Sequence, residues 1–278
     1  MRHRRRLSAL LVALTVSACS GGAPTSAPAS ATASPASAVE LQVYAAASLT
    51  AVLDQAKAVY AASNPGITLT VSTDSSTALE TKIEEGAPAD VFLSADTANP
   101  QKLVAKGLAS GSMTLFAGNK LTVIVPTANP AGIASPTDLA RSGVKIIAAA
   151  DGVPIEKYTG QWLAKVSALP SYGADFAARY AANVVSREDN VGALLAKVGL
   201  GEGDAGVVYV TDAKSSDKVA TIDIPDAENV PAAYGGVVVK ASAHQAAASA
   251  FLAWLAGGGG QAVLATFGFL PPSTAPRE

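Results

Sequence analysis

From Glu40 onward, short apolar runs alternate with patterns of helical spacing, and this alternation is the feature that most limits the possible folds. The first run, Leu41–Ala45, is followed by a helical pattern over Leu49–Ala62, and similar units follow it. Strands that alternate with helices in this way favour parallel sheets covered by helices. The sequence therefore predicts an α/β protein.

The predicted elements fall into two α/β lobes that the chain crosses twice, with a cleft between them. A long apolar strand at Leu121–Pro126 is the candidate for one crossing. The other predicted strands cover residues 41–45, 67–72, 91–93, 144–149, 183–186, 206–210, 219–224 and 235–239. The predicted helices cover residues 49–62, 74–84, 99–106, 137–141, 155–168, 173–181, 190–198 and 245–255, with a last helix after the glycine run 257–260.

The N-terminus reads as an export signal. Basic residues at 2–6 precede an apolar run over Leu7–Val16, which is too short to span a bilayer. The run ends in Val16-Ser17-Ala18-Cys19, which resembles a bacterial lipobox. We expect a signal peptide over residues 1–18, a lipidated Cys19, and a flexible tether of Ser, Ala and Pro through residue 39. An ordinary signal peptide with an incidental cysteine is the alternative.

Composition excludes several classes of partner. The formal net charge is −2, and loss of the four N-terminal arginines would leave 16 basic against 22 acidic residues, a net charge of −6. A mildly acidic protein does not suit nucleic acid, nor electrostatic attraction to an anionic membrane. Cys19 is the single cysteine, so no disulfide forms within the chain.

Three junctions between strands and helices share one chemical character. Ser48 precedes the first predicted helix, Ser75 and Ser76 precede the second, and Asn190 precedes a later one. A helix N-terminus leaves N–H groups unpaired and attracts anions. If these junctions meet at the cleft, they offer hydroxyl and N–H donors without Lys or Arg. Each residue, taken alone, is better explained as a plain helix cap than as a ligand of an anion.

Tyr209 ends the apolar strand that begins at Gly206. Its hydroxyl could donate into the cleft, or its ring could simply pack in the core. Taken by itself, the residue favours packing, because buried tyrosines usually serve packing and make an incidental hydrogen bond.

The sequence contains few of the residues and motifs that form catalytic sites. His244 is the only histidine after the leader, and no Gly-x-Ser-x-Gly motif is present. One histidine and one cysteine do not build the usual zinc site. We therefore expect no catalytic residues, no cofactor and no metal site, and an exported serine hydrolase is only a remote alternative.

Six segments, taken in order, resemble the substrate-binding proteins of molybdate ABC importers, the ModA-type family. The resemblance runs from about residue 41 to about residue 270. The matching segments are Ala45-Ala46-Ala47-Ser48-Leu49-Thr50, Asp74-Ser75-Ser76-Thr77, Gly86–Asp96, Val153-Pro154, Glu188–Leu194 and Gly206–Ala213.

The resemblance implies a two-lobed periplasmic-binding-protein fold of type II, with a mixed sheet flanked by helices in each lobe and the ligand in the cleft. It implies that molybdate or tungstate is bound by Ser48, Ser76, Ile155, Asn190 and Tyr209, with molybdenum present only inside the oxyanion. The family commonly has Ala-Gly after Val-Pro, whereas this chain has Ile155-Glu156. A carboxylate at that position would repel a dianion unless it were turned away.

The resemblance also implies a cellular role. The protein would be an exported monomer, anchored through Cys19 to the outer face of the cell membrane, and would deliver its ligand to the permease subunits of the importer. A receptor for another oxyanion such as sulfate is the alternative. The expected lobes are residues 40–120 with 236–278, and residues 121–235.

Overall fold

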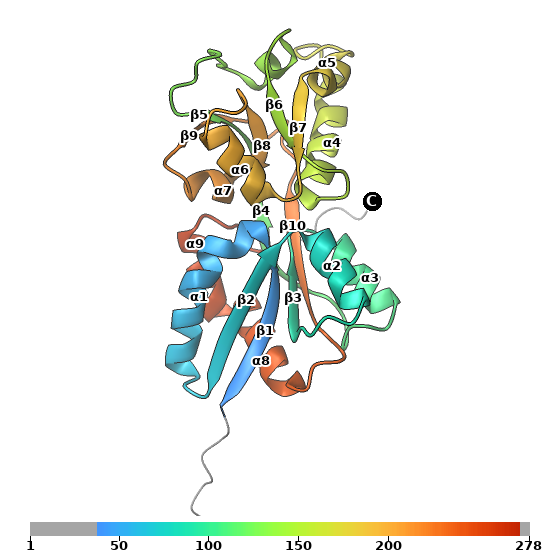
Figure 1. The fold of residues 1–278 in the computed structure, drawn as a ribbon, viewed down its shortest axis with the longest axis vertical. Helices are drawn as coiled ribbons and strands as arrows, with labels where there is room; N and C mark the ends of the chain where they lie inside the picture. Colours follow the sequence, from blue (N-terminus) through green and yellow to red (C-terminus); the bar gives the residue numbers. More distant parts are fainter. Residues whose placement is uncertain (1–37, 273–278) are drawn as a thin grey trace, which may run out of the picture. The chain divides into compact units, whose positions relative to one another are not determined.

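The computed structural model describes residues 38–272, and two groups of β-sheet organise this part of the chain (Figure 1). One five-stranded sheet has the strand order β2-β1-β3-β10-β4. Its three parallel strands lie together, and β10 is antiparallel to both of its neighbours. We name this sheet and its helices the first lobe. Its strands are β1 (Val39–Ala46), β2 (Ile67–Asp74), β3 (Val91–Ser94), β4 (Thr114–Asn119) and β10 (Ala232–Val238).

Helices cover both faces of this sheet, as the alternation of side chains along β3 requires. Phe92 faces one way and joins a small core with Leu79 and Leu103. Val91 and Leu93 face the other way and join the main core. The helices on the Phe92 face are α2 (Ser76–Glu84) and α3 (Ala98–Ala105); those on the other face are α1 (Thr50–Ser63), α8 (Gln245–Ala256) and α9 (Gly258–Thr266).

The second lobe contains a three-stranded antiparallel sheet, β8-β5-β9, and a parallel pair, β6-β7. A single bridge from Ile146 to Ala205 links the two sheets. The strands are β5 (Leu121–Pro126), β6 (Ile146–Ala149), β7 (Val184–Glu188), β8 (Gly206–Tyr209) and β9 (Val219–Asp223). The helices are η2 (Pro136–Ala140), α4 (Pro154–Ser167), α5 (Phe176–Ala182), α6 (Val191–Gly199) and α7 (Val210–Lys214).

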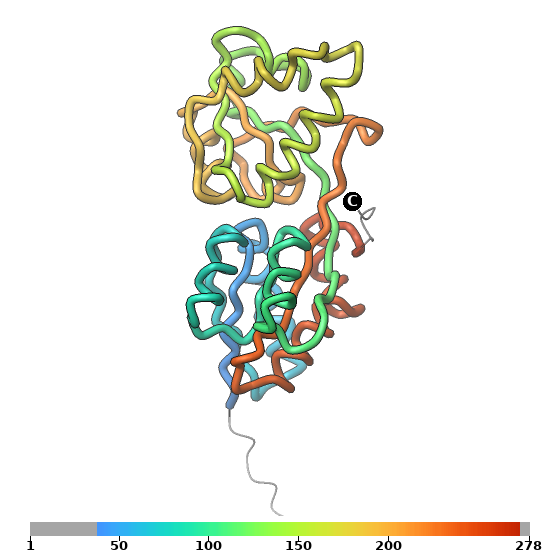
Figure 2. Tube along the Cα trace, turned by 90° about the vertical axis from the view of Figure 1, so that its right-hand side faces the viewer, coloured from blue at the N-terminus to red at the C-terminus, as the bar shows by residue number. Residues whose placement is uncertain are grey.

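The chain crosses between the lobes twice, at Lys120 and in the connection from β9 to β10. Figure 2 shows these green and orange segments running beside each other. They are joined by the antiparallel pairing of β4 with β10, in which Ala232 lies opposite Asn119. The α/β class predicted from the sequence is confirmed.

Several local predictions were wrong. The strand β4 was missed because Gly118 and Asn119 are residues that strands rarely contain. A Cβ at Gly118 would lie 3.1 Å from the Pro271 carbonyl oxygen, a tight contact that favours glycine there. The predicted crossing strand, Leu121–Pro126, pairs only with β8 and β9, so it lies wholly within the second lobe. The short helix α7 was also missed, and the helix expected near 137–141 is the 3₁₀ helix η2.

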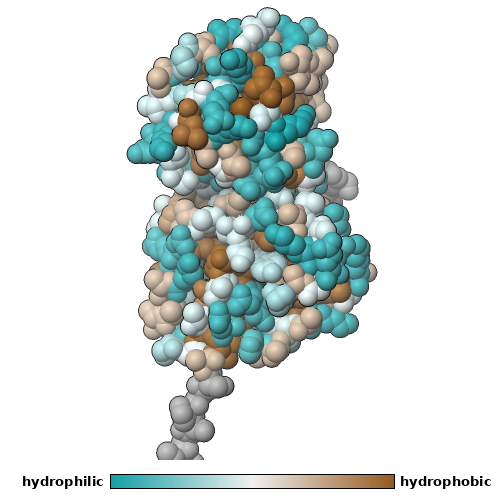
Figure 3. Space-filling model, in the orientation of Figure 1, coloured by the Kyte–Doolittle hydropathy of each residue, from teal (hydrophilic) through white to brown (hydrophobic). Residues whose placement is uncertain are grey.

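The surface carries few large apolar side chains. Among the described residues, five are exposed, and they lie on separate parts of the chain: Val59, Val104, Val185, Leu200 and Leu270. Hydrophobic residues gather only in small groups on the face shown in Figure 3. Most of the large apolar side chains of the described residues thus lie away from the surface, in the core.

The expected signal peptide, Cys19 and most of the tether lie outside the described residues. Within residues 38–272, no single helix is long and apolar enough to cross a membrane. Together, α8 and α9 meet that criterion by length and composition, with a bend of 55° between them. Phe251, Leu252 and Leu255 of α8 are buried in the main core.

The corner between α8 and α9 depends on glycine. The run Gly257–Gly260 was expected to separate two helices, but Gly258–Gly260 form the first turn of α9. A Cβ on Gly260 would lie 2.3 Å from the Leu255 Cα, and one on Gly259 would lie 2.4 Å from the Trp254 Nε1. The glycines therefore permit a close approach of two helices and do not break the second one.

We expect Gly260→Ala to destabilise the protein by about 1–3 kcal/mol, because the added methyl group meets backbone that cannot move aside cheaply. The matched control is Gly258→Ala, whose Cβ would have nothing within 4 Å. That variant should unfold at the same urea concentration or a higher one, since alanine is the better helix former. Equal urea midpoints for the two variants would contradict the close-approach explanation.

Candidate functional site

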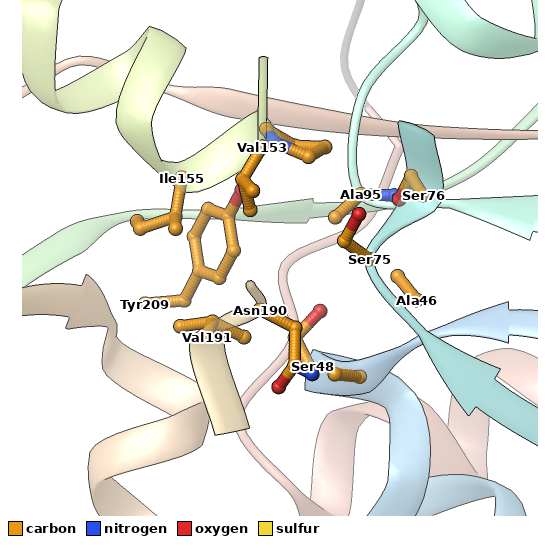
Figure 4. A pocket seen from close by; sticks show the side chains of 12 residues that line it. Ala46, Ser48, Ser75, Ser76, Ala95, Val153, Ile155, Asn190, Val191 and Tyr209 are labelled. Atoms are coloured by element: carbon orange, nitrogen blue, oxygen red, sulfur yellow. The ribbon is translucent and has the colours of Figure 1, made fainter. Parts of the chain in front are cut away.

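A small pocket lies where the ends of β1, β2, β3 and β8 meet the first turns of helices from both lobes (Figure 4). Its cavity volume is about 10 Å³, close to the least that holds one water molecule. In this conformation it therefore has room for about one water molecule, and a larger ligand enters only if the lobes part. All five predicted site residues line it. The lining residues are Ala46, Ala47, Ser48, Ser75, Ser76, Ala95, Val153, Pro154, Ile155, Asn190, Val191 and Tyr209.

Ser48 reaches this pocket in a different way from the one predicted. It is not a helix cap, because it lies inside a 3₁₀ turn, η1 (Ala47–Leu49), and its side chain caps neither that turn nor α1. Its hydroxyl instead lies 3.1 Å from the hydroxyl of Tyr234 on β10. The partner is 186 residues away in the sequence, so no local pattern could reveal it.

Ser75 and Ser76 divide the two roles that the sequence left open. Ser75 is the N-cap of α2 and accepts the Ala78 N–H at 3.1 Å. The Ser76 oxygen is buried and accepts the Ala95 N–H at 3.0 Å, so its own proton is left to donate. The helix α2 therefore begins at Ser76, directly after its cap.

Ile155 provides the first free N–H of α4. Pro154 before it has no N–H, and the Glu156 N–H bonds the Val153 carbonyl at 2.9 Å. The Glu156 carboxylate turns away from the pocket and bonds Arg187, Oε1 to Nη1, at 2.9 Å. Burial raises the pKa of Glu156 and outweighs the opposing effect of Arg187. The negative charge of Glu156, which the sequence placed near the ligand, is thus directed away from the pocket and toward Arg187.

Asn190 is the N-cap of α6, and its side-chain oxygen accepts the Ala193 N–H at 3.0 Å. The side chain is therefore used locally, and the pocket is left with first-turn backbone donors. Val191 lines the pocket beside it, a residue that the sequence prediction did not name. The sequence could have indicated Val191 as a site residue, because the residue after an N-cap also presents a free N–H.

Tyr209 combines both roles that the sequence left open. Its ring packs edge-on against Tyr158 and Tyr234, with centroids 6.2 Å and 5.6 Å away. Its hydroxyl is buried and has no hydrogen-bond partner among the described residues. Burial, reinforced by neighbouring groups, raises the pKa of Tyr209 well above its usual value, so the hydroxyl keeps its proton. A buried donor without an acceptor is costly unless a ligand supplies one.

Two contacts join the lobes beside the pocket. Thr77 of α2 donates to the Gly152 carbonyl at 2.6 Å, across to the loop before α4. Asp74 at the end of β2 lies near the Asn190 side chain. Burial opposes ionisation of Asp74, but hydrogen bonds from Lys82 and the Ser75 N–H outweigh it, and Asn190 adds to them, so the pKa of Asp74 is lowered. The lobes are therefore in contact in this structure.

The pocket has no charged side chain in its lining. Among residues 38–272, no cluster of three or more His, Cys, Asp or Glu side chains could hold a metal ion. The chemistry that the lining offers is donation of hydrogen bonds from neutral hydroxyl and N–H groups. Such an arrangement suits a small anion without protons of its own.

A buried carboxyl group lies behind Tyr209. Asp212 in α7 accepts the Tyr209 N–H at 3.2 Å and is almost inaccessible to solvent. Burial raises the pKa of Asp212 to about 7, and the hydrogen bond from Tyr209 offsets only part of the effect. Below neutral pH this group is therefore largely uncharged.

Asp212→Asn should remove a pH dependence of stability. Between about pH 4, near the ordinary pKa of an aspartate, and pH 7, the folded form holds a proton that the unfolded form has lost. Stability therefore falls as pH rises through this window, by up to about 1.4 kcal/mol per pH unit. Urea unfolding from pH 5 to 8 should show a smaller decline for Asp212→Asn than for wild type. The exposed Asp217→Asn is the control, and equal declines in all three proteins would refute the assignment.

Comparison with known proteins adds independent information. Residues 41–270 match the family model described as bacterial extracellular solute-binding protein. The chain is 35% identical over 274 residues to the molybdate-binding protein ModA of Mycobacterium tuberculosis, an alignment that covers 96% of each chain.

Solved structures agree on the fold. The periplasmic molybdate-binding protein of Azotobacter vinelandii superposes with a TM-score of 0.70 at 26% identity, covering 84% of this chain and all of that one. The sulfate-binding protein SubI of M. tuberculosis superposes with a TM-score of 0.74 at 22% identity, covering 84% and 87%. The two-lobed periplasmic-binding-protein fold implied by the sequence is confirmed. With a match over residues 41–270 and a close relative along nearly its whole length, this chain belongs to the family of bacterial extracellular solute-binding proteins.

Proposed function

We propose that this protein captures molybdate or tungstate outside the cytoplasm and delivers it to the membrane subunits of an ABC importer. The observation that carries the proposal is the buried, unpaired Tyr209 hydroxyl in a pocket lined only by neutral groups. The 35% sequence identity with a relative that is named for molybdate binding supports the choice of ligand.

The proposed ligands are the hydroxyl and N–H groups of Ser48 and Ser76, the Tyr209 hydroxyl, and the N–H groups of Ile155 and Asn190. These donors replace the hydration shell of the anion. A hydrogen bond to a charged group contributes about 1.5–3 kcal/mol, so several of them hold a dianion without a counter-charge. The helix N-termini add a favourable dipole field.

The donor set favours fully ionised oxyanions, because a protonated ligand would place its hydroxyl against donors alone. Charge does not separate molybdate from sulfate, so cavity size must do so. A sulfate receptor is therefore the alternative function. Molybdate and tungstate are too similar in size for this pocket to separate them.

The proposal includes the cellular arrangement expected from the sequence. A signal peptide over residues 1–18 directs export, and acyl chains on Cys19 hold the protein at the outer face of the membrane. Residues 40–120 with 232–278, and residues 121–231, move as two bodies that close over the ligand. The boundary expected between residues 235 and 236 would divide β10, which begins at Ala232. The protein acts as a monomer and carries out no catalytic step.

Ligand binding is tested by a thermal-shift panel of molybdate, tungstate, sulfate, phosphate and chromate. A ligand that binds only the folded state raises the melting temperature. We expect a rise with molybdate and tungstate that the other three anions do not match. A rise with sulfate alone would favour the alternative receptor, and no rise with any oxyanion would refute the proposal.

Tyr209→Phe should separate binding from stability. Loss of the hydroxyl should weaken molybdate binding by about 10- to 150-fold, the equivalent of about 1.5–3 kcal/mol. The ligand-free variant should be at least as stable as wild type, because an unpaired buried hydroxyl is removed. Titration calorimetry and urea unfolding measure the two effects.

Tyr60→Phe is the matched control for Tyr209→Phe. Tyr60 is also buried with an unpaired hydroxyl, but it packs against Phe251 and Trp254, away from the pocket lining. The Tyr60→Phe variant should bind molybdate with the affinity of the wild type. Unchanged affinity in Tyr209→Phe as well would remove Tyr209 from the site.

Thr77→Val should weaken closure of the lobes, since the bond to the Gly152 carbonyl is lost. We expect molybdate to dissociate about 2- to 12-fold faster, the equivalent of one neutral hydrogen bond of about 0.5–1.5 kcal/mol. Stopped-flow release measures the rate. Thr81→Val is the control, because within residues 38–272 the Thr81 hydroxyl bonds only the Thr77 carbonyl of its own helix. Equal release rates in the two variants would show that the Thr77 contact does not hold the lobes closed.

A further inference from the structure

A buried chain of hydrogen bonds runs from the crossing strands to Ser48. Asn119, at the end of β4, and Tyr234, on β10, are both almost fully buried. The Asn119 Nδ2 lies 3.3 Å from the Tyr234 hydroxyl, which lies 3.1 Å from the Ser48 hydroxyl. Of these three residues, only Ser48 lines the pocket.

The direction of the first bond follows from the Asn119 amide. Its Oδ1 accepts the Lys120 N–H at 3.0 Å, which fixes the orientation of the group. The Nδ2 therefore faces the other way and donates to Thr211 Oγ1 at 2.8 Å and to Tyr234. An amide nitrogen does not accept hydrogen bonds, so the Tyr234 oxygen is the acceptor.

The direction of the second bond follows from the Tyr234 proton. Burial raises the pKa of Tyr234 well above its usual value, so the phenol stays protonated. Within residues 38–272, the only acceptor that its hydroxyl contacts is the Ser48 oxygen. If Ser48 donated instead, a buried phenol proton would have no acceptor, which is unfavourable.

We infer that Asn119 and Tyr234 are positioning residues that commit the Ser48 hydroxyl to donate toward the ligand. Because the Ser48 oxygen accepts from Tyr234, its own proton is left for the pocket. The inference rests on the proposed function, and it assigns to this chain a device for selecting unprotonated oxyanions. Without Tyr234, the Ser48 hydroxyl could rotate and accept a proton from a ligand such as hydrogenphosphate.

Tyr234→Phe keeps the ring and removes the bond to Ser48. At pH 8, titration calorimetry should show molybdate affinity reduced by about 2- to 12-fold, the range of one neutral hydrogen bond. The ratio of molybdate affinity to hydrogenphosphate affinity should fall by at least the same factor, because the variant loses the constraint against a protonated ligand. Tyr60→Phe, the same chemical change in the core, should leave both quantities unchanged. Thermal melting verifies that each variant is folded.

A double-mutant cycle with Ser48→Ala tests the route of the effect. If Tyr234 acts through Ser48, adding Tyr234→Phe to Ser48→Ala should change neither the affinity nor the ratio further. A persistent effect in that background would overturn the inference, as would a Tyr234→Phe variant that matches Tyr60→Phe. Wild-type protein that binds no oxyanion would instead refute the proposed function, so the two failures are distinguishable.

Discussion

The antiparallel pairing of β10 with β4 is the interaction on which the two-lobed arrangement depends. It brings the two crossing segments together, although they are more than a hundred residues apart in the chain. Asn119 and Tyr234 lie on these strands and bond each other, and Asn119 also bonds Thr211 of the second lobe. The polar network behind the pocket is therefore built on the connection between the lobes.

The preference of the pocket for an anion depends on several neutral hydrogen-bond donors together more than on any single residue. In α2 and α6 the caps Ser75 and Asn190 each accept a single N–H of the first turn, from Ala78 and Ala193, and the earlier N–H groups are left for a ligand. In α4, Pro154 has no N–H, so Ile155 provides the first one. The charged groups nearby are paired outward, as Glu156 is with Arg187. Donors thus converge on one point while formal charges are kept out of the lining.

The sequence predicted most of what depends on local pattern. Strand and helix alternation gave the α/β class, and Ser75 and Asn190 cap their helices as expected because a cap is made within three residues. The predictions were wrong where contacts between residues far apart in the sequence determine the local structure. Ser48 was expected to be a cap, but its hydroxyl bonds Tyr234. At Gly118 in β4 the Pro271 carbonyl approaches closely and favours glycine, which no local rule could predict. The lack of a partner for Tyr209 likewise appears only in three dimensions.

The charge-free pocket also has a kinetic consequence. The chain has a net charge of −2, and none of the described residues that line the pocket is charged, so long-range attraction of an anion is weak. Association is then not accelerated by electrostatic steering, and tight binding must come from slow release. Under the proposed mechanism, retention of the ligand depends on how rarely the lobes separate. For a carrier that must surrender its cargo, this leaves one controllable step, because a partner that holds the lobes apart releases the anion without competing for it.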